Sequence, residues 1–234
     1  MNRLNLIKMK KHLIKYTLEF VVIVLGISVS FWVNKRQNDK ENKINEIHIY
    51  EDIKMELNEL TKMINERTAV FNFDIALIDN VYNESYNSKF TYQDMLTAVA
   101  DWRGFEPSIE IYSSLKYDGG LKYVSNSEIK LAIDKFYARS SSIYANMEDE
   151  VIVQREILKF LHINYPLVLL NQDSKLIDEN TKINHFKNII TNDLTFRSLL
   201  KSKRRFMYNK KIGIDQYRLR HEELLSMIDK VLSY

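Results

Sequence analysis

The chain of 234 residues carries 34 Lys and Arg against 31 Asp and Glu, and it contains no Cys. This balance argues against a nucleic-acid-binding protein, which needs a clustered basic excess, and the lack of Cys excludes disulfides, thiol nucleophiles and zinc sites built on Cys. Because only 2 Pro and 5 Gly interrupt the sequence, long helices are favoured over a fold with many turns.

The N-terminal stretch has the pattern of a membrane anchor. Residues 1–16 are basic and contain no acid, and residues 17–33 are apolar apart from Glu19. A helix over residues 17–33 spans about 25 Å, near the short end of the lengths that cross a bilayer. Tyr16 and Trp32 lie at its two ends, as aromatic residues do at membrane interfaces. We predict a transmembrane helix over residues 17–33, preceded by a cytoplasmic N-terminus of residues 1–16.

Two other interpretations compete with the anchor. A cleaved signal peptide would use Ser28 and Ser30 as its small-residue site, but Trp32 follows almost at once. A buried core helix of a soluble protein would not need the basic flank. The flanking Lys and Arg orient the N-terminus toward the cytoplasm and place about 200 residues on the other side of the membrane. We therefore expect a bacterial inner-membrane protein with its C-terminal part in the periplasm.

Glu19, Gly26 and Ser30 fall on nearly one face of the predicted transmembrane helix. Gly26 and Ser30 form a small-x-x-x-small pair, which permits the close approach of a second helix. Three roles are open for Glu19: an interfacial carboxylate paired with Lys15, a buried polar contact with a partner helix, or a proton relay. We predict that Glu19, Gly26 and Ser30 form a helix-association face in the membrane.

Two stretches of the sequence carry spaced residues that form recognisable patterns. The first runs from a Tyr and a Glu through an apolar segment to a Gly, an Asn and a charged tail: Tyr16, Glu19, Gly26, Asn34, Lys35, Arg36, Asp39 and Lys40. The second places an aromatic-containing helix before a Gly turn and an Asn-x-Glu helix start: Leu115, Gly119, Gly120, Leu121, Asn126, Glu128 and Tyr137.

Both patterns resemble those of a family of bacterial single-pass membrane proteins, known as a domain of unknown function. This sequence has one residue fewer than the family between Tyr16 and Glu19. It also lacks the Trp that often follows the position of Asn34, with Trp32 the nearest. The resemblance implies a membrane-anchored helical protein with a helical domain outside the cytoplasm, and it implies no catalytic residue.

Residues 34–84 continue from the anchor as a charged stretch without Pro or Gly. Apolar residues recur three and four positions apart, interrupted at Arg67, and they predict a long amphipathic juxtamembrane helix. Its stripe either pairs with another chain as a coiled coil or packs under its own domain. We favour the core helix, because the regular repeat is short. The stripe comprises Tyr50, Ile53, Leu57, Leu60, Ile64 and Phe71.

Residues 85–234 are predicted to form a helical domain outside the cytoplasm, with short loops that favour antiparallel packing. A loop is expected over residues 164–178, around Pro166. Helices are expected over residues 92–102, over 107–116 with Pro107 in the first turn, from the capping box Ser125–Glu128 to residue 144 or 160, and over 194–206 and 212–232. The sequence thus predicts an all-α protein, in which one N-terminal transmembrane helix continues into a long amphipathic helix and is followed by an antiparallel helical bundle.

The sequence contains no motif for catalysis, for a metal or for a cofactor. It lacks a metalloprotease helix, a dinucleotide fingerprint and a phosphate-binding loop, and no two of its five His are at metal spacing within one helix. His221, with Glu222 and Glu223, is expected to lie on a solvated helix surface. We predict a protein that is not an enzyme and that needs no cofactor and no metal.

One basic cluster stands out near the C-terminus. A solvated helix face is one interpretation, and contact with an acidic partner, anionic lipid or cell-wall polymer is the other. Nucleic acid is not expected as a partner, because this part is predicted to lie outside the cytoplasm. The cluster comprises Lys201, Lys203, Arg204, Arg205, Lys210 and Lys211.

These features together favour a membrane-anchored scaffold or an accessory subunit of an envelope complex. Its expected partners are the lipid bilayer and either further copies of itself or other envelope membrane proteins. Two alternatives stay open at this point. One is a ligand-sensing domain that signals through a partner, and the other is an enzyme of cell-envelope polymers, which would show paired carboxylates or histidines in a concave site.

Overall fold

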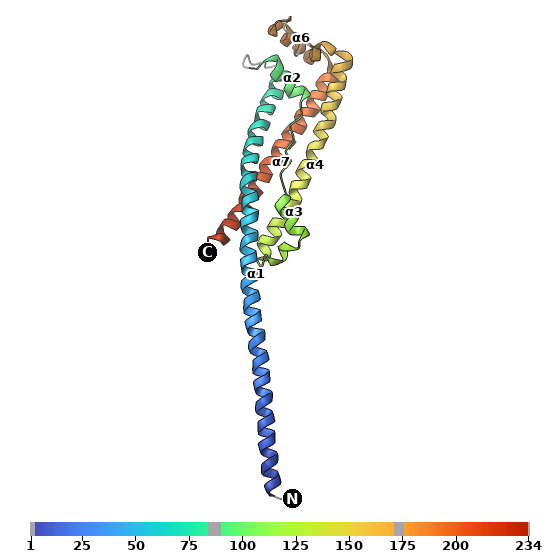
Figure 1. Ribbon diagram of the computed structural model, residues 1–234. Helices are drawn as coiled ribbons and strands as arrows, with labels where there is room; N and C mark the ends of the chain where they lie inside the picture. The colour runs from blue at the N-terminus through green and yellow to red at the C-terminus, as the bar shows by residue number, and fades with distance from the viewer. Residues whose placement is uncertain (1–2, 84–89, 171–175, 234) are drawn as a thin grey trace. The chain divides into compact units, whose positions relative to one another are not determined.

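The computed structural model describes residues 3–83, 90–170 and 176–233, with the side chains of residues 3–14, 141–142 and 144–148 left out. All secondary structure in these ranges is helical, as the composition predicts, and no strand occurs among them (Figure 1). The elements are α1 (Arg3–Tyr82), α2 (Tyr92–Ala100), α3 (Glu110–Tyr117), η1 (Gly120–Tyr123), α4 (Ser127–Asn164), α5 (Pro166–Leu170), α6 (Glu179–Asn192) and α7 (Leu194–Leu232).

The chain divides into two units, Met1–Ile49 and Tyr50–Tyr234. The division falls inside α1, so residues 50–82 belong with the C-terminal unit rather than with the expected juxtamembrane segment of residues 34–84. The expected domain boundary at residues 84–85 lies outside the described residues.

The described part of Met1–Ile49 is a single run of helix in which every side chain from Lys15 to Ile44 is exposed. The helix α1 is long and apolar enough to cross a membrane, and its most apolar window has no buried residue. This agrees with the predicted anchor in length and composition.

The unit Tyr50–Tyr234 is built around α4, α7 and the second part of α1. Phe160 of α4 stacks on Phe196 near the start of α7, whereas Ser140 near the middle of α4 bonds Tyr217 further along α7. The numbers rise along one helix as they fall along the other, so α4 and α7 run in opposite directions (Figure 1).

The second part of α1 also runs opposite to α7. Asp79 of α1 pairs with Arg204 of α7, while Thr61, about five turns earlier on α1, contacts His221, which lies about five turns further along α7. The predicted stripe faces this core: Tyr50, Ile53, Leu57, Leu60, Ile64 and Phe71 are all buried. The stripe is therefore covered within the chain, as a core helix requires.

A second group of buried apolar residues joins the shorter helices to the three long ones. It is a continuous cluster whose members come from α1, α2, α4, α5, α6 and α7 and include Ile78, Met95, Ile157, Val168, Phe186 and Phe196. Tyr92 ties α2 to α5, because its hydroxyl donates a hydrogen bond of 2.6 Å to the carbonyl of Val168.

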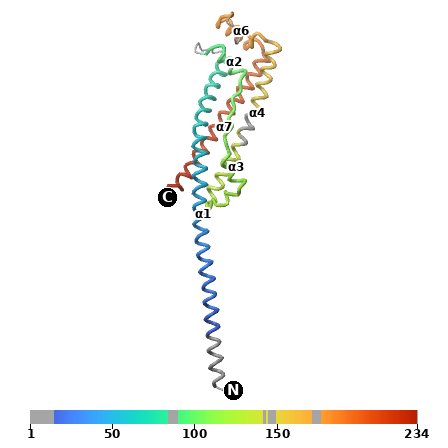
Figure 2. The backbone as a smooth tube through the Cα atoms, viewed as in Figure 1, coloured from blue at the N-terminus to red at the C-terminus, as the bar shows by residue number. Residues whose placement is uncertain are grey.

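Several predicted boundaries differ from the structure. The helix expected from Pro107 begins only at Glu110, and residues 101–109 form an extended segment between α2 and α3 (Figure 2). The segments expected at residues 194–206 and 212–232 are one helix, α7, because Gly213 is accommodated within it. The expected loop over residues 164–178 contains the short helix α5.

The start of α4 also differs by one residue. Asn126, not Ser125, is the N-cap, and its side-chain oxygen accepts hydrogen bonds from the amides of Glu128 and Ile129. The turn before it uses Gly119 at a φ of 69°, a left-handed conformation that Gly adopts without a steric penalty. The expected Gly turn is thus present.

Candidate functional site

The predicted association face lies on the exposed apolar part of α1. Gly26 and Ser30 border a shallow hollow of about 370 Å³ that also reaches Ile23 and Asn34. The Ser30 hydroxyl donates to the Gly26 carbonyl at 2.9 Å, so its proton is already used within the helix. The hollow exists because Gly26 has no side chain to fill it, and nothing lies within 4 Å of where its Cβ would be.

Glu19 lies outside that hollow. Its carboxylate is 3.8 Å from Lys15 Nζ, and both side chains are more than half exposed. The two residues line a separate hollow of about 530 Å³ with Leu18, Val22 and Ile23. The structure thus brings Gly26 and Ser30 together and places the Glu19 carboxylate beside Lys15.

The predicted basic cluster does not form one surface. Lys201 and Arg205 are exposed, whereas Lys203 and Lys210 are buried. The helical period explains the division, because residues 203, 207, 210 and 214 of α7 fall on the stripe that faces the core. The expectation of a single surface for an acidic partner or lipid is therefore wrong for these two lysines.

The remaining two members of the cluster are half-buried and paired. Arg204 Nε donates to Asp79 Oδ1 at 2.5 Å, and Tyr208 donates to the other oxygen of Asp79 at 2.6 Å. Lys211 Nζ lies 2.7 Å from Asp215 one turn later. Of the six members, Lys201 and Arg205 are the two that are exposed.

Lys203 binds the backbone carbonyls at the C-terminal end of α2. Its ammonium donates to the carbonyl of Val99 at 3.0 Å and to the carbonyl of Asp101 at 2.5 Å. These carbonyls lie at the C-terminus of α2, where a cation is favoured by the helix dipole. Burial lowers the pKa of Lys203 to about 8, and the neighbouring Glu150 opposes that shift.

Lys210 lies two positions further along the same stripe, after Met207. It forms an ion pair of 2.5 Å with Glu150 of α4, in which each side chain is 3% exposed. It also donates to the carbonyl of Arg103 at 3.0 Å and lies 4.5 Å from the ring centre of Phe71. One ammonium thus binds α1, α4 and the 101–109 segment to α7.

The 101–109 segment obtains its remaining bonds from other helices. Gln154 of α4 donates to the carbonyl of Ala100 at 2.6 Å, just before the segment. Arg103 lies 3.4 Å from the buried carboxylate of Asp74 on α1. Burial raises the pKa of Asp74, although Arg103 opposes the shift. Since an extended segment makes no helical hydrogen bonds, these side chains take the place of secondary structure.

A second polar site links α1 to α4 and α3. Both oxygens of Glu56 accept hydrogen bonds, from the Tyr137 hydroxyl at 2.6 Å and from the amide of Ile111 at 3.0 Å. Burial and the bond to Glu56 raise the pKa of Tyr137. His221 is also buried, with Nε2 2.7 Å from the carbonyl of Leu57, so the expectation of a solvated surface is wrong for this residue.

These buried groups have the geometry of structural clamps. Each lysine ammonium is directed at backbone carbonyls or at a carboxylate, and Glu56 is directed at a hydroxyl and an amide. Among the described residues, no three His, Asp or Glu side chains are grouped so that they hold a metal ion. Polar atoms placed in this way stabilise one packing of the helices.

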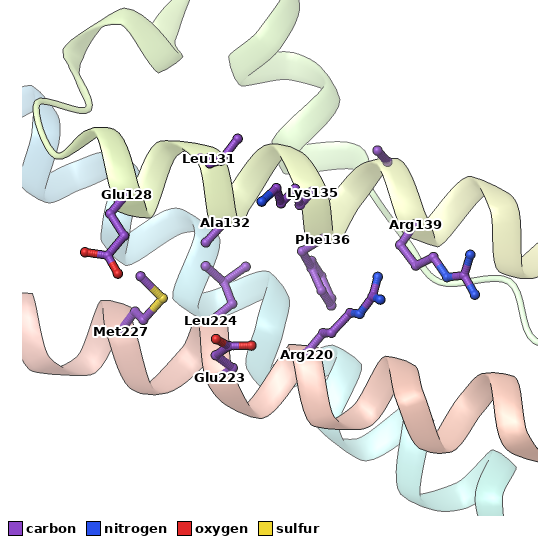
Figure 3. Close-up of a pocket in the computed structure, with 11 residues that line it drawn as sticks. Glu128, Leu131, Ala132, Lys135, Phe136, Arg139, Arg220, Glu223, Leu224 and Met227 are labelled. Carbon is purple, nitrogen blue, oxygen red and sulfur yellow. The ribbon is translucent and has the colours of Figure 1, made fainter.

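A groove of about 610 Å³ lies between α4 and α7 (Figure 3). Its floor is apolar and includes Ala132, Phe136, Leu224 and Met227. Charged side chains line its rim, and Figure 3 shows them distributed along its length: Glu128, Glu223, Lys135, Arg139 and Arg220.

Comparison with known proteins adds no relative. No protein-family model, no curated protein and no solved structure matches the chain. The family resemblance of the two sequence patterns therefore stays a prediction, and function is argued from this chain's own residues.

Sequence reasoning missed the inward lysines and the α4–α7 groove. The lysines carried a detectable signal, because residues 203, 207, 210, 214, 217 and 221 are spaced three and four apart. With one helix predicted to end at residue 206, the stripe is divided and its lysines are interpreted as surface residues. The stripe becomes visible only when α7 is known to continue through Gly213. The groove carried no signal, since it depends on how α4 and α7 face each other.

Proposed function

We propose that this protein is a single-pass protein of the bacterial inner membrane, with residues 1–16 in the cytoplasm and residues 34–234 in the periplasm. It acts without catalysis of its own, as a scaffold or accessory subunit of an envelope complex. It associates through its transmembrane helix and through an antiparallel helical bundle formed by the C-terminal unit.

The observation that carries this proposal is the fully exposed apolar run of α1 with a hollow in it. Side chains such as Phe20, Val22 and Leu25 are exposed on all sides of the helix. Apolar surface left in water costs about 25 cal/mol per Å², so a run of this kind is stabilised by lipid. Basic residues before the run favour a cytoplasmic N-terminus.

The hollow at Gly26 and Ser30 supports association inside the membrane. In lipid, helices pair through close van der Waals contact, which small residues permit. A second helix at this hollow would approach the backbone of α1 more closely than at any Val or Ile of the same run. Glu19, two turns before Gly26 on the same face, would then lie at the cytoplasmic edge of the contact.

The experiment is native mass determination of the full-length chain in a gentle detergent, with identification of every co-purifying protein. The test variant is Gly26→Leu, which fills the hollow. The matched control is Ser28→Leu, which places the same side chain on nearly the opposite face of the helix.

The proposal expects a defined assembly for the native chain and for Ser28→Leu, and its loss in Gly26→Leu. A monomer without companions, or an assembly that Gly26→Leu leaves intact, would contradict association through this face. Glu19→Gln provides the second test, since it removes the charge and keeps the shape.

A further inference from the structure

A hollow of about 540 Å³ lies between α1 and the 101–109 segment, inside the unit Tyr50–Tyr234. Cavities that hold small ligands have volumes of this order. One wall is a single face of α1, because its lining residues 59, 62, 63, 66 and 67 are spaced three and four apart. The other wall comprises residues 102 and 104–106 of the segment. These residues define the segment hollow.

The second wall is held against α1 at both ends. Arg103 lies 3.4 Å from Asp74, and the amide of Ile111, just beyond the segment, donates to Glu56 at 3.0 Å. The numbers rise along the segment as they fall along α1, so the two walls run in opposite directions. Lys210 also donates to the carbonyl of Arg103. Walls that are fixed in this way lose little conformational entropy when a ligand binds.

Side chains of both charges line the segment hollow. The acids are Glu59, Glu66 and Glu106, the bases are Lys62 and Arg67, and all five are exposed. Within the ranges that the structure describes, none of these five side chains forms a hydrogen bond or an ion pair. The hollow therefore offers opposite charges that are not already paired with one another.

An aromatic ring lies among these charges. The ring of Trp102 lies directly on Gly104, because a Cβ at Gly104 would be 2.5 Å from Cη2 of the indole. The lack of a side chain at Gly104 thus lets the ring lie along the segment and line the hollow. The indole nitrogen is buried and has no hydrogen-bond acceptor among the described residues. Met63 and the fully buried Phe105 add apolar surface.

We propose that the segment hollow binds a small zwitterionic ligand, namely a free amino acid or a short peptide with an ammonium group, a carboxylate and an apolar side chain. Arg67 and Lys62 bind the carboxylate, since a guanidinium matches its geometry with two parallel hydrogen bonds. Glu59 and Glu66 bind the ammonium group. The ring of Trp102 covers the apolar side chain.

Ligands of a single charge fit this hollow less well. An anion such as phosphate would lie beside three carboxylates, and a simple cation would lie beside Lys62 and Arg67. Like charges repel each other, whereas a ligand with both charges is attracted by both sets. The length of the α1 wall also suits a short ligand. Residues 59 and 67 are about 12 Å apart along the helix axis, which is about the length of an extended tripeptide.

This inference goes beyond the proposed scaffold role and does not depend on it. The segment hollow lies in the C-terminal unit, whereas the proposed membrane contact is at Gly26 and Ser30. A ligand in the hollow bridges α1 and the 101–109 segment, so it stabilises the folded form of the C-terminal unit.

Trp102 provides the readout for the test. The chain contains two Trp, so Trp32→Phe leaves Trp102 as the sole source of indole fluorescence. The full-length Trp32→Phe chain in detergent is titrated with L-leucine and with the tripeptide alanyl-leucyl-alanine. Matched probes lack one charge each, because the N-acetylated form of either compound lacks the ammonium group and the amidated form lacks the carboxylate. The midpoint of thermal unfolding is the second readout.

At least one of the two zwitterions is expected to change the Trp102 emission along a saturating curve and to raise the unfolding midpoint. The acetylated and amidated forms are expected to bind about 10-fold more weakly, because each leaves one set of charges without a counterpart. Binding of leucine alone identifies free amino acids as the ligands, and binding of the tripeptide alone identifies peptides.

Two variants test the assigned charges. Arg67→Gln and Glu66→Gln are each expected to weaken binding of the zwitterion about 10-fold. The matched controls are Arg155→Gln and Asp52→Asn, which make equivalent changes at exposed positions outside the hollow and are expected to leave binding unchanged.

The inference is overturned if neither zwitterion changes the emission or the unfolding midpoint, or if an acetylated or amidated form binds as tightly as its parent. It is also overturned if the changes outside the hollow weaken binding equally. Gly26→Leu separates this inference from the proposed membrane contact, because that variant is expected to keep the ligand even where it loses the assembly. An assembled native chain that binds neither zwitterion removes the ligand site alone.

Discussion

Two stretches of α1 differ in the exposure and the arrangement of their apolar side chains. In residues 17–33 they lie on all sides of the helix and are exposed, as at Leu25, which is 58% exposed. In residues 50–82 they lie on one stripe and are buried, as at Leu57, which is 0% exposed. The first stretch requires an apolar environment around the whole helix, and the second requires a partner on one face only.

The difference shows that arrangement, not apolar content alone, decides what covers a helix. A stripe with period 3.6 leaves a polar face for water, so the protein's own α4 and α7 suffice as cover. An apolar run without a stripe has no face for water and is matched by lipid.

Charges follow the same division. Glu19 lies on the exposed run and is met by the exposed Lys15, whereas Lys210 and Glu150 lie inside the C-terminal unit and are met by each other. An exposed pair contributes little to stability, but a buried charge without its partner is costly. The following predictions test this comparison, from the largest expected effect to the smallest.

Glu150→Leu is expected to lower the free energy of unfolding of the C-terminal unit by about 3–5 kcal/mol, because it leaves the Lys210 ammonium buried without its carboxylate. Urea unfolding of the full-length chain in detergent, followed by circular dichroism, measures this effect. The double variant Glu150→Leu/Lys210→Met is expected to recover most of the loss. A single variant as stable as the native chain would contradict the buried pair.

Leu57→Ala is expected to destabilise the C-terminal unit by about 2–5 kcal/mol, since it removes a fully buried side chain and leaves a cavity. Leu25→Ala makes the same chemical change in the exposed run and is expected to leave the unfolding transition of the C-terminal unit unchanged. Thermal unfolding of both full-length variants provides the comparison. Equal destabilisation would mean that the two stretches do not differ in the way described.

Lys203 predicts how stability depends on pH. Its pKa is about 8 in the folded protein and at its ordinary, higher value in the unfolded chain. Between these values the unfolded chain binds more protons, so stability rises with pH. The penalty for the buried charge is fully present below the folded pKa and is relieved above it.

The free energy of unfolding is therefore expected to rise by about 2 kcal/mol from about pH 7 to about pH 9.5. Lys203→Met is expected to abolish this rise, which denaturant titrations at several pH values measure. Tyr92 and Tyr112 act in the opposite sense only at higher pH, because burial raises the pKa of each to about 12. A rise that persists in Lys203→Met would assign it to another group.

Asn126→Ala is expected to cost about 1 kcal/mol, because the amides of Glu128 and Ile129 lose the oxygen that caps α4. Asn126→Gly, which also removes the cap but tolerates the backbone conformation better, is expected to cost only a few tenths of a kcal/mol. Differential scanning calorimetry of the two variants distinguishes the cases. A negligible loss in Asn126→Ala would show that the side-chain oxygen is not what stabilises the start of the helix.

The sequence by itself determined the helical class, the apolar span at residues 17–33 and the stripe from Tyr50 to Phe71. Each of these follows from local composition and period, which are properties of one segment at a time. The turn at Gly119 was equally predictable, because its conformation is set by its own backbone.

The tertiary structure alone decided that α7 is one helix, that residues 101–109 are extended and that Lys203 and Lys210 face inward. A Lys side chain is stable in a core only where acceptors bind its ammonium. Lys203 bonds the carbonyl of Val99, and Lys210 bonds the carbonyl of Arg103 and the carboxylate of Glu150. These acceptors lie far from the two lysines in the sequence. The groove between α4 and α7 likewise depends on residues that are distant in the sequence. The charged side chains that line it belong to two helices, and only the packing of α4 against α7 brings them to one groove.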